Sequence, residues 1–150
     1  MEIVKAGKED IESLMAIRLE MLCEVNDLDK DYEFSTELKN CAREYFLSGN
    51  QTTLLAKESG ENIGCASINY ITIMPTFNHP TGKRAFLMSV YTKEEYRRRG
   101  IALKMVEMLI AEAKEKDCTE IILDATEAGR PLYKALGFVE SDETMCLRLK

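Results

Sequence analysis

Three arginines and a glycine, Arg97-Arg98-Arg99-Gly100, form the densest group of positive charge in the sequence. They follow an apolar and aromatic run, Phe86 to Thr92, whose composition predicts a buried strand. Apolar residues three and four positions apart between Ile101 and Ala113 predict an amphipathic helix after them. Such a turn presents unpaired backbone N–H groups and the positive end of a helix dipole to an anion. Because the net charge is −6, we expect a phosphorylated cofactor rather than a nucleic-acid backbone.

A second stretch with reactive side chains runs from Leu123 to Phe138. Together with Arg97-x-x-Gly100-x-Ala102, it resembles the Q/R-x-x-G-x-G/A and N-x-x-A-x-x-L-Y-x-x-x-G-F motifs of the GCN5-related N-acetyltransferase (GNAT) superfamily. The order and spacing of the predicted elements resemble that family over nearly the whole chain. The second motif departs at two positions, with Thr126 where Asn is usual and Gly129 where Ala is usual.

The resemblance implies that acetyl-coenzyme A is the cosubstrate and that an acceptor amine attacks its thioester directly. The turn and helix start would hold the pyrophosphate through backbone amides and arginine charge, and the preceding strand would pair with the pantetheine arm as with an added strand. The cofactor-binding positions implied in this way are Val90, Tyr91, Thr92, Arg97, Arg98, Arg99, Gly100, Ile101, Ala102, Thr126 and Gly129.

Tyr133 occupies the position of the family's frequent general acid, which protonates the departing thiolate. The alternative for this residue is an aromatic ring packed between helix and sheet. The resemblance also implies a strand bulge near Ser89 and Val90 whose N–H groups stabilise the oxyanion. No general base can be assigned, and the candidates are a water chain or one of the carboxylates of Glu20, Glu24, Glu33, Asp124 and Glu127.

Two acidic segments, from Glu24 to Phe34 and from Glu140 to Glu143, fall where the family's acceptor enters. They favour a cationic amine acceptor, and the alternative is a pair of solvated loops in an acidic protein. The Pro75–Gly82 tract has the composition of a loop and is a candidate acceptor wall. His79, the only histidine, is either a base in this loop or a loop residue stiffened by Pro80.

The composition predicts one domain spanning residues 1–150, large enough to bury a single core. Five cysteines without a C-x-x-C pair indicate reduced thiols, and one histidine leaves no ligand set for a metal. The N-terminus has no signal-peptide pattern and no apolar run is long enough to span a bilayer, so we expect a cytoplasmic protein without membrane or nucleic-acid partners. A homodimer is left open.

Hydrophobic periodicity and capping residues predict the helices and strands that position these residues. Helices are expected from Lys8 to Asn26, after a capping Ser35 to Ser48, from Ile101, and between Gly129 and Gly137. The expected strands are 2–6, 52–57, 63–73, 86–92, 120–125 and a C-terminal hairpin of 138–139 with 144–149. The predicted fold is α/β (α+β), with a mixed, mostly antiparallel sheet of about six to seven strands and about four helices on both faces.

Function follows from the two motifs. We expect an acetyl-coenzyme A-dependent N-acetyltransferase acting on a cationic small molecule or peptide amine. A non-catalytic acyl-coenzyme A binding or sensing module is the alternative, since it would keep the turn without needing Tyr133. Neither a P-loop nor a dinucleotide-binding glycine pattern occurs.

Overall fold

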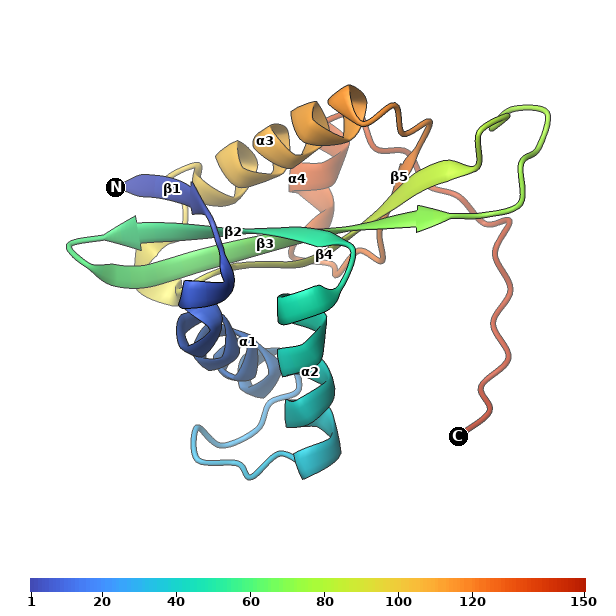
Figure 1. Ribbon diagram of the computed structural model, residues 1–150. Coiled ribbons are helices and arrows are strands. Elements are labelled where there is room, and N and C mark those ends of the chain that lie inside the picture. The colour runs from blue at the N-terminus through green and yellow to red at the C-terminus, as the bar shows by residue number, and fades with distance from the viewer.

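The computed structural model describes residues 1–150 and arranges them as one sheet between two layers of helices (Figure 1). In chain order the elements are β1 (Glu2–Lys5), a 3-10 turn (Lys8–Asp10), α1 (Ile11–Val25), α2 (Thr36–Ser48), β2 (Gln51–Glu58), β3 (Glu61–Thr72), β4 (Lys83–Thr92), a 3-10 turn (Glu94–Tyr96), α3 (Ile101–Glu115), β5 (Ile121–Ile122) and α4 (Arg130–Ala135).

The sheet has the spatial order β1-β2-β3-β4-β5. The first four strands are antiparallel neighbours, and β5 lies parallel to β4. The expected parallel pairing of the two strands that flank α3 is therefore confirmed. It is short, because only Ala85 and Phe86 of β4 have partners on β5.

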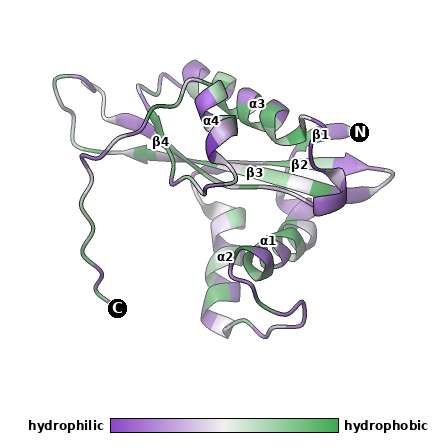
Figure 2. Cartoon of the chain, turned by 180° about the vertical axis from the view of Figure 1, so that it is seen from behind, coloured by the Kyte–Doolittle hydropathy of each residue, from purple (hydrophilic) through white to green (hydrophobic).

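Helices α3 and α4 cover one face of the sheet, and α1 and α2 cover the other (Figure 1). The larger core lies under α3, where Met105, Val106 and Leu109 pack against Ile68 and other inward residues of the strands. The smaller core lies under α1 and includes Leu14, Ile17, Leu55, Cys65 and Tyr91. The buried residues of α1 and α3 are apolar, whereas α2, which extends away from the sheet in Figure 2, has none. This two-sided packing fixes β4 from both faces.

Local signals explain where most elements begin and end. Ser35 caps α2, since its hydroxyl accepts a hydrogen bond from the Leu38 amide at 3.1 Å. Gly137 follows α4 with a φ of +96°, a left-handed conformation that glycine adopts without strain. The apolar stripe expected on α1 ends sooner than the pattern indicated. Val25, the last residue of α1, is 53% exposed.

The expectation of six to seven strands is wrong in number, because the sheet has five. The C-terminal hairpin is the part that does not form, and residues 138–150 have no regular secondary structure. Phe138 packs edge to face on Tyr133 with 5.8 Å between ring centroids, and Glu140 pairs with Arg130 on α4. These contacts hold the chain beside α4 where the hairpin would have to begin. The expected strand 120–125 is correspondingly reduced to Ile121–Ile122.

Candidate functional site

The turn before α3 leaves a continuous run of backbone donors without acceptors. The first helical hydrogen bond runs from the Lys104 amide to the Gly100 carbonyl at 3.0 Å, and none of the six amides from Arg98 to Leu103 donates to a backbone carbonyl. No side chain caps this helix. Arg98 and Gly100 both have positive φ, +64° and +75°, which coils the turn so that its amides lie at one end of α3. The arrangement suits an anion with several oxygens.

The three arginines of this turn differ in what they contact. The Arg97 Nε donates to the Thr92 carbonyl at 2.7 Å, and its Nη2 lies 2.5 Å from Glu24 of α1. Arg99 lies over the ring of Tyr96 and 3.5 Å from Glu58. The exposed Arg98 pairs with none of the chain's carboxylates. Its charge is consequently the one most available to a ligand.

Strand β4 carries a bulge in front of this turn. Cys65 pairs with Tyr91 while Ser67 pairs with Met88, so Ser89 and Val90 stand opposite one residue of β3. Ser89 has a φ of +59°, and its carbonyl accepts a hydrogen bond from the Cys65 thiol at 3.3 Å. The bulge thus lies at the position expected from sequence. It turns the strand backbone away from the regular ladder.

One edge of β4 is open along the bulged half. Since the pairing with β5 involves only Ala85 and Phe86, the stretch from Leu87 to Thr92 has no strand on that side. The predicted pantetheine contacts at Val90, Tyr91 and Thr92 all lie on this stretch. An extended ligand arm can pair with such an edge through main-chain hydrogen bonds. The 3-10 turn Glu94–Tyr96 connects this open edge to the turn of free amides.

The second motif lies at the start of α4. The Thr126 hydroxyl accepts a hydrogen bond from the Gly129 amide at 3.1 Å, so this side chain stabilises the turn into the helix. A Cβ at Gly129 would lie 3.0 Å from the Tyr133 ring and 3.3 Å from the Thr126 hydroxyl. The glycine found here in place of the family's alanine therefore makes room for the threonine and the tyrosine.

Tyr133 is partly buried, packed against the core under α3 and against Phe138. Burial raises the pKa of its phenol, because the ionised form would lose solvation. The hydroxyl is consequently protonated at neutral pH and able to donate. The packing role that sequence left as the alternative is also present, and the two roles are compatible.

One side chain near the bulge was not singled out from sequence. Arg18 of α1 donates from Nη1 to the Ser89 hydroxyl at 3.0 Å. The signal for it was its spacing: Arg18 lies four residues from both Leu14 and Leu22, on the apolar stripe of its helix. A charged residue at such a position indicates a partner on the facing sheet. Its cation lies next to the bulge.

Of the candidate bases, Glu20 and Glu24 lie between α1 and β4. The Tyr91 hydroxyl donates to Glu20 at 3.3 Å, and Glu24 pairs with Arg97. Burial, together with the negative charge of Glu20 and Glu24, raises the pKa of Tyr91. Glu33 and Glu127 form exposed ion pairs elsewhere, with Lys39 and Arg130 respectively. Among these four carboxylates, Glu20 is the one that contacts Tyr91 in the bulged half of β4.

His79 lies at the opposite end of β4 from the turn. Its Nδ1 is 2.7 Å from the Thr119 hydroxyl and its Nε2 is 3.4 Å from Glu120. These contacts join the β3–β4 loop to the segment before β5. The structure therefore gives His79 a local structural role and does not bring it to the other predicted site residues.

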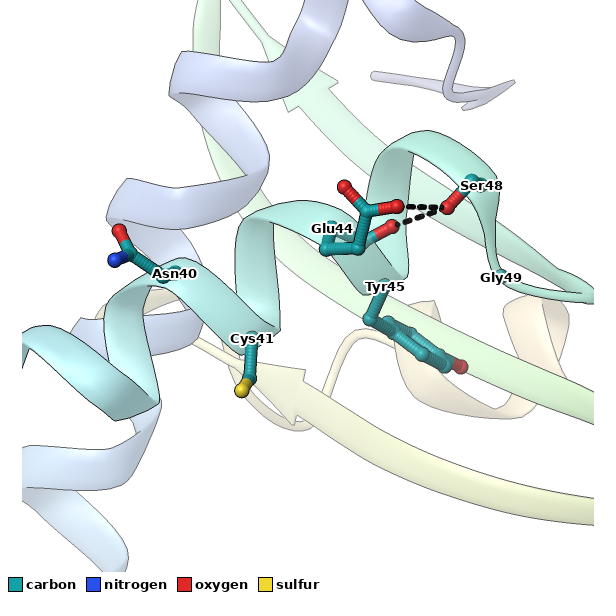
Figure 3. Close-up of a pocket in the computed structure, with 6 residues that line it drawn as sticks. All are labelled: Asn40, Cys41, Glu44, Tyr45, Ser48 and Gly49. Atoms are coloured by element: carbon teal, nitrogen blue, oxygen red, sulfur yellow. Dashed lines mark hydrogen bonds between the residues drawn. The ribbon is translucent and has the colours of Figure 1, made fainter.

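A hollow of about 560 Å³ lies along α2, away from the turn. Figure 3 shows its lining residues, which are Asn40, Cys41, Glu44, Tyr45, Ser48 and Gly49. The Tyr45 hydroxyl donates to Asn69, whose amide donates to the Phe86 carbonyl of β4 at 2.9 Å. Burial raises the pKa of Tyr45 to about 12, so it remains a donor. This chain of hydrogen bonds connects α2 to β4, and the hollow contains none of the predicted site residues.

The structure holds no group of three or more His, Cys, Asp or Glu residues that could bind a metal ion. None of its helices combines the length and apolar character needed to cross a membrane.

The comparisons with known proteins agree on one family. A family model described as the acetyltransferase (GNAT) family matches residues 19–138. A crystal structure of a predicted acetyltransferase with acetyl-CoA from Clostridium acetobutylicum is 31% identical, with a TM-score of 0.87, and the match covers 99% of this chain and 96% of that one.

Two curated relatives match over shorter segments. Thialysine N-epsilon-acetyltransferase of Bos taurus is 29% identical over 61% of this chain and 57% of its own length. Aminoglycoside N(6')-acetyltransferase type 1 of Acinetobacter baumannii is 35% identical over 53% and 55%, respectively. The matched segment is thus only a little more than half of each relative.

Proposed function

Because this chain belongs to the GNAT family of acetyltransferases, we propose that it transfers an acetyl group from acetyl-coenzyme A to an amine acceptor. The observation that carries the proposal is the run of six free amides from Arg98 to Leu103, which follows the open edge of β4 in the chain after one 3-10 turn. A pyrophosphate bound at the helix start and a pantetheine arm along the strand fit these two features in sequence. In this arrangement the thioester lies near the bulge.

The protein holds the cosubstrate mainly through backbone groups. The amides of Arg98, Arg99, Gly100, Ile101 and Ala102 donate to the pyrophosphate, and the Arg98 charge adds to their field. The Arg97 side chain acts indirectly, because its contacts with Thr92 and Glu24 fix the turn on β4 and α1. Val90, Tyr91 and Thr92 present their main chain to the pantetheine.

The chemical step needs charge stabilisation and two proton transfers. The amine nitrogen attacks the thioester carbon, the C–N bond forms and the C–S bond breaks. The bulge at Ser89 and Val90, with Arg18 beside it, favours the negative charge that develops on the carbonyl oxygen. Tyr133 gives its proton to the departing thiolate, and Glu20, directly or through water, accepts the proton from the amine.

An acyl-enzyme route is disfavoured by the state of the nearest thiol. Cys65 is buried beside the bulge, and burial raises the pKa of its thiol to about 12. A thiol with such a pKa is not a nucleophile at neutral pH. Direct transfer to the amine is therefore the mechanism that the arrangement supports.

We propose a cationic amine as acceptor, in line with the amine acceptors named for the two curated relatives. The loop between α1 and α2 carries the exposed acids Asp27, Asp29, Asp31 and Glu33. Surface charge acts by steering, so neutralising these acids should lower kcat/KM a few-fold for a cationic amine at low salt and have little effect at high salt. Turnover indifferent both to the acids and to salt would exclude this acceptor class.

The test of the proposed function is release of coenzyme A from acetyl-coenzyme A in the presence of a panel of small-molecule and peptide amines. At least one amine should give turnover above hydrolysis, with an acetylated product detected by mass spectrometry. Tight binding of acetyl-coenzyme A without turnover for any amine class would instead support the sensing module.

A further inference from the structure

Arg18 of α1 is a partly buried cation without an anionic partner in the chain. The chain has four partly buried arginines, and the other three each pair with a carboxylate: these are Arg43, Arg84 and Arg130. Arg18 forms no such pair, and its Nη1 donates instead to the neutral Ser89 hydroxyl at 3.0 Å. Its charge is therefore available to an anionic group of a ligand.

The guanidinium of Arg18 also has free hydrogen-bond donors. Arginine carries five N–H donors in a planar fork, and here only Nη1 is engaged, by Ser89 and by the Met21 sulfur at 3.8 Å. Nε and Nη2 form no hydrogen bond. Neither is sealed from solvent, since the fully buried side-chain atoms without a partner belong to Asn62, Arg84 and Thr92. The Nε–Nη2 edge matches the two oxygens of a carboxylate.

Arg18 lies next to the proposed site of acetyl transfer, because Ser89 belongs to the bulge of β4. Glu20, the proposed base, lies two residues further along α1 and contacts Tyr91, two residues after Ser89 on β4. Burial raises the pKa of the Cys65 thiol to about 12, and the charges of Arg18 and Glu20 act on it in opposite directions. A cation and an anion are thus close to the same thiol. Together they offer one group to a carboxylate and one to an ammonium.

We propose that the acceptor carries a carboxylate as well as its reacting amine, and that Arg18 binds this carboxylate through Nε and Nη2. The inference rests on the proposed acetyl transfer, and it narrows the acceptor class to amino acids and their close analogues. Nη1 remains on the Ser89 hydroxyl beside the bulge. The exposed acids of the loop between α1 and α2 act on the ammonium group of such a molecule as it approaches. Arg18 is then a specificity-determining residue.

The first experiment compares acceptors that differ only in the carboxylate. Release of coenzyme A from acetyl-coenzyme A is measured with free lysine, histidine and tyrosine, and with their decarboxylated counterparts cadaverine, histamine and tyramine. In the pair with the highest turnover, the amino acid should have the higher kcat/KM by about tenfold or more, because a charge-assisted, bidentate pair discriminates by roughly that factor.

Variants of Arg18 then assign this preference to one side chain. Arg18→Gln should lower kcat for both members of a pair, because the charge beside the bulge is lost, and it should also bring the ratio of their kcat/KM values close to one. Arg18→Lys keeps the charge without the fork and should retain part of the preference. Arg43→Gln is the matched control, since it removes one positive charge that pairs with Glu12. It should leave the ratio unchanged, and circular dichroism should show all variants folded.

Equal kcat/KM values within each pair, turnover confined to amines without a carboxylate, or a preference that survives Arg18→Gln would overturn the role of Arg18 and leave acetyl transfer in place. No turnover with any amine would instead contradict the proposed function. Calorimetry with coenzyme A-saturated protein then decides the inference separately. Binding of an amino acid that is lost in Arg18→Gln and kept in Arg43→Gln would support it, and absence of such binding would overturn it.

Discussion

The starts of α2 and α3 differ in how their first backbone amides are hydrogen-bonded. At α2, the Ser35 hydroxyl caps the helix by accepting a hydrogen bond from the Leu38 amide. At α3, Gly100 supplies no cap and six successive amides have no acceptor. The free amides at the start of α3 are available to a ligand, as the proposed cosubstrate site requires. We therefore propose that the cosubstrate site consists largely of backbone groups that the chain leaves unpaired.

The strongest test of this contrast is Gly100→Asp. The substitution places a carboxylate among donors meant for phosphate, and acetyl-coenzyme A affinity should fall by about 3 to 4 kcal/mol, two to three powers of ten in Kd by calorimetry. Gly60→Asp is the matched control, because Gly60 also has positive φ and open space around its Cα. It should leave the affinity unchanged. Equal effects of the two variants would mean that backbone strain, not the site, is being measured.

Tyr133→Phe separates chemistry from binding at the open helix start. Removing the hydroxyl while keeping the ring's packing should lower kcat about ten- to a thousandfold, ~1.4 to 4 kcal/mol of barrier, with acetyl-coenzyme A affinity unchanged. Because burial raises the pKa of this phenol above its ordinary value, the loss should be the same at neutral and mildly alkaline pH. Wild-type turnover in the variant, with chemistry rate-limiting, would reduce Tyr133 to a packing residue.

Arg98 and Arg99 should contribute unequally to acetyl-coenzyme A affinity, because only Arg99 has partners within the chain. Arg98→Ala removes a charge with no partner in the chain and should weaken acetyl-coenzyme A binding about tenfold. Arg99→Ala removes a charge already shared with Glu58 and Tyr96, and the loss should be about twofold. Calorimetry on both variants measures the two losses of affinity. A larger loss for Arg99 would contradict the assignment of Arg98 as the available charge.

The smallest expected effect on stability or binding is at the capped start of α2. Ser35→Ala removes the cap of α2 and should lower the free energy of unfolding by about 1 kcal/mol in urea titrations. Acetyl-coenzyme A affinity should be unaffected, because α2 contributes none of the predicted cosubstrate-binding residues. A coupled loss of affinity would show that the two helix starts are not independent.

Local patterns predicted the parts of the site that depend on neighbouring residues. The apolar run before Arg97, the periodicity after Gly100 and the cap at Ser35 were all sufficient to place their elements. Contacts between distant residues were not predictable in this way. The pairing of Arg97 with Glu24 joins positions 73 apart, and it engages one of the three arginines that the sequence assigned to the ligand. The placement of Arg18 at the bulge depends likewise on how α1 packs on the sheet.

The C-terminal residues show a different limit. Alternation in residues 144–149 correctly indicates strand character in the side chains, but a strand also needs a partner edge. The contacts of Phe138 and Glu140 with α4 decide where the chain is when the pattern begins. Sequence periodicity contains no information about that location, so the predicted hairpin was wrong.

Amide resonances during a titration with coenzyme A test the central claim most directly. In ¹H–¹⁵N spectra of the wild-type protein, the amides from Arg98 to Leu103 should show the largest shifts, while those from Ser35 to Leu38 remain in place. Saturable binding of coenzyme A that leaves the amides of residues 98–103 unchanged would contradict the account.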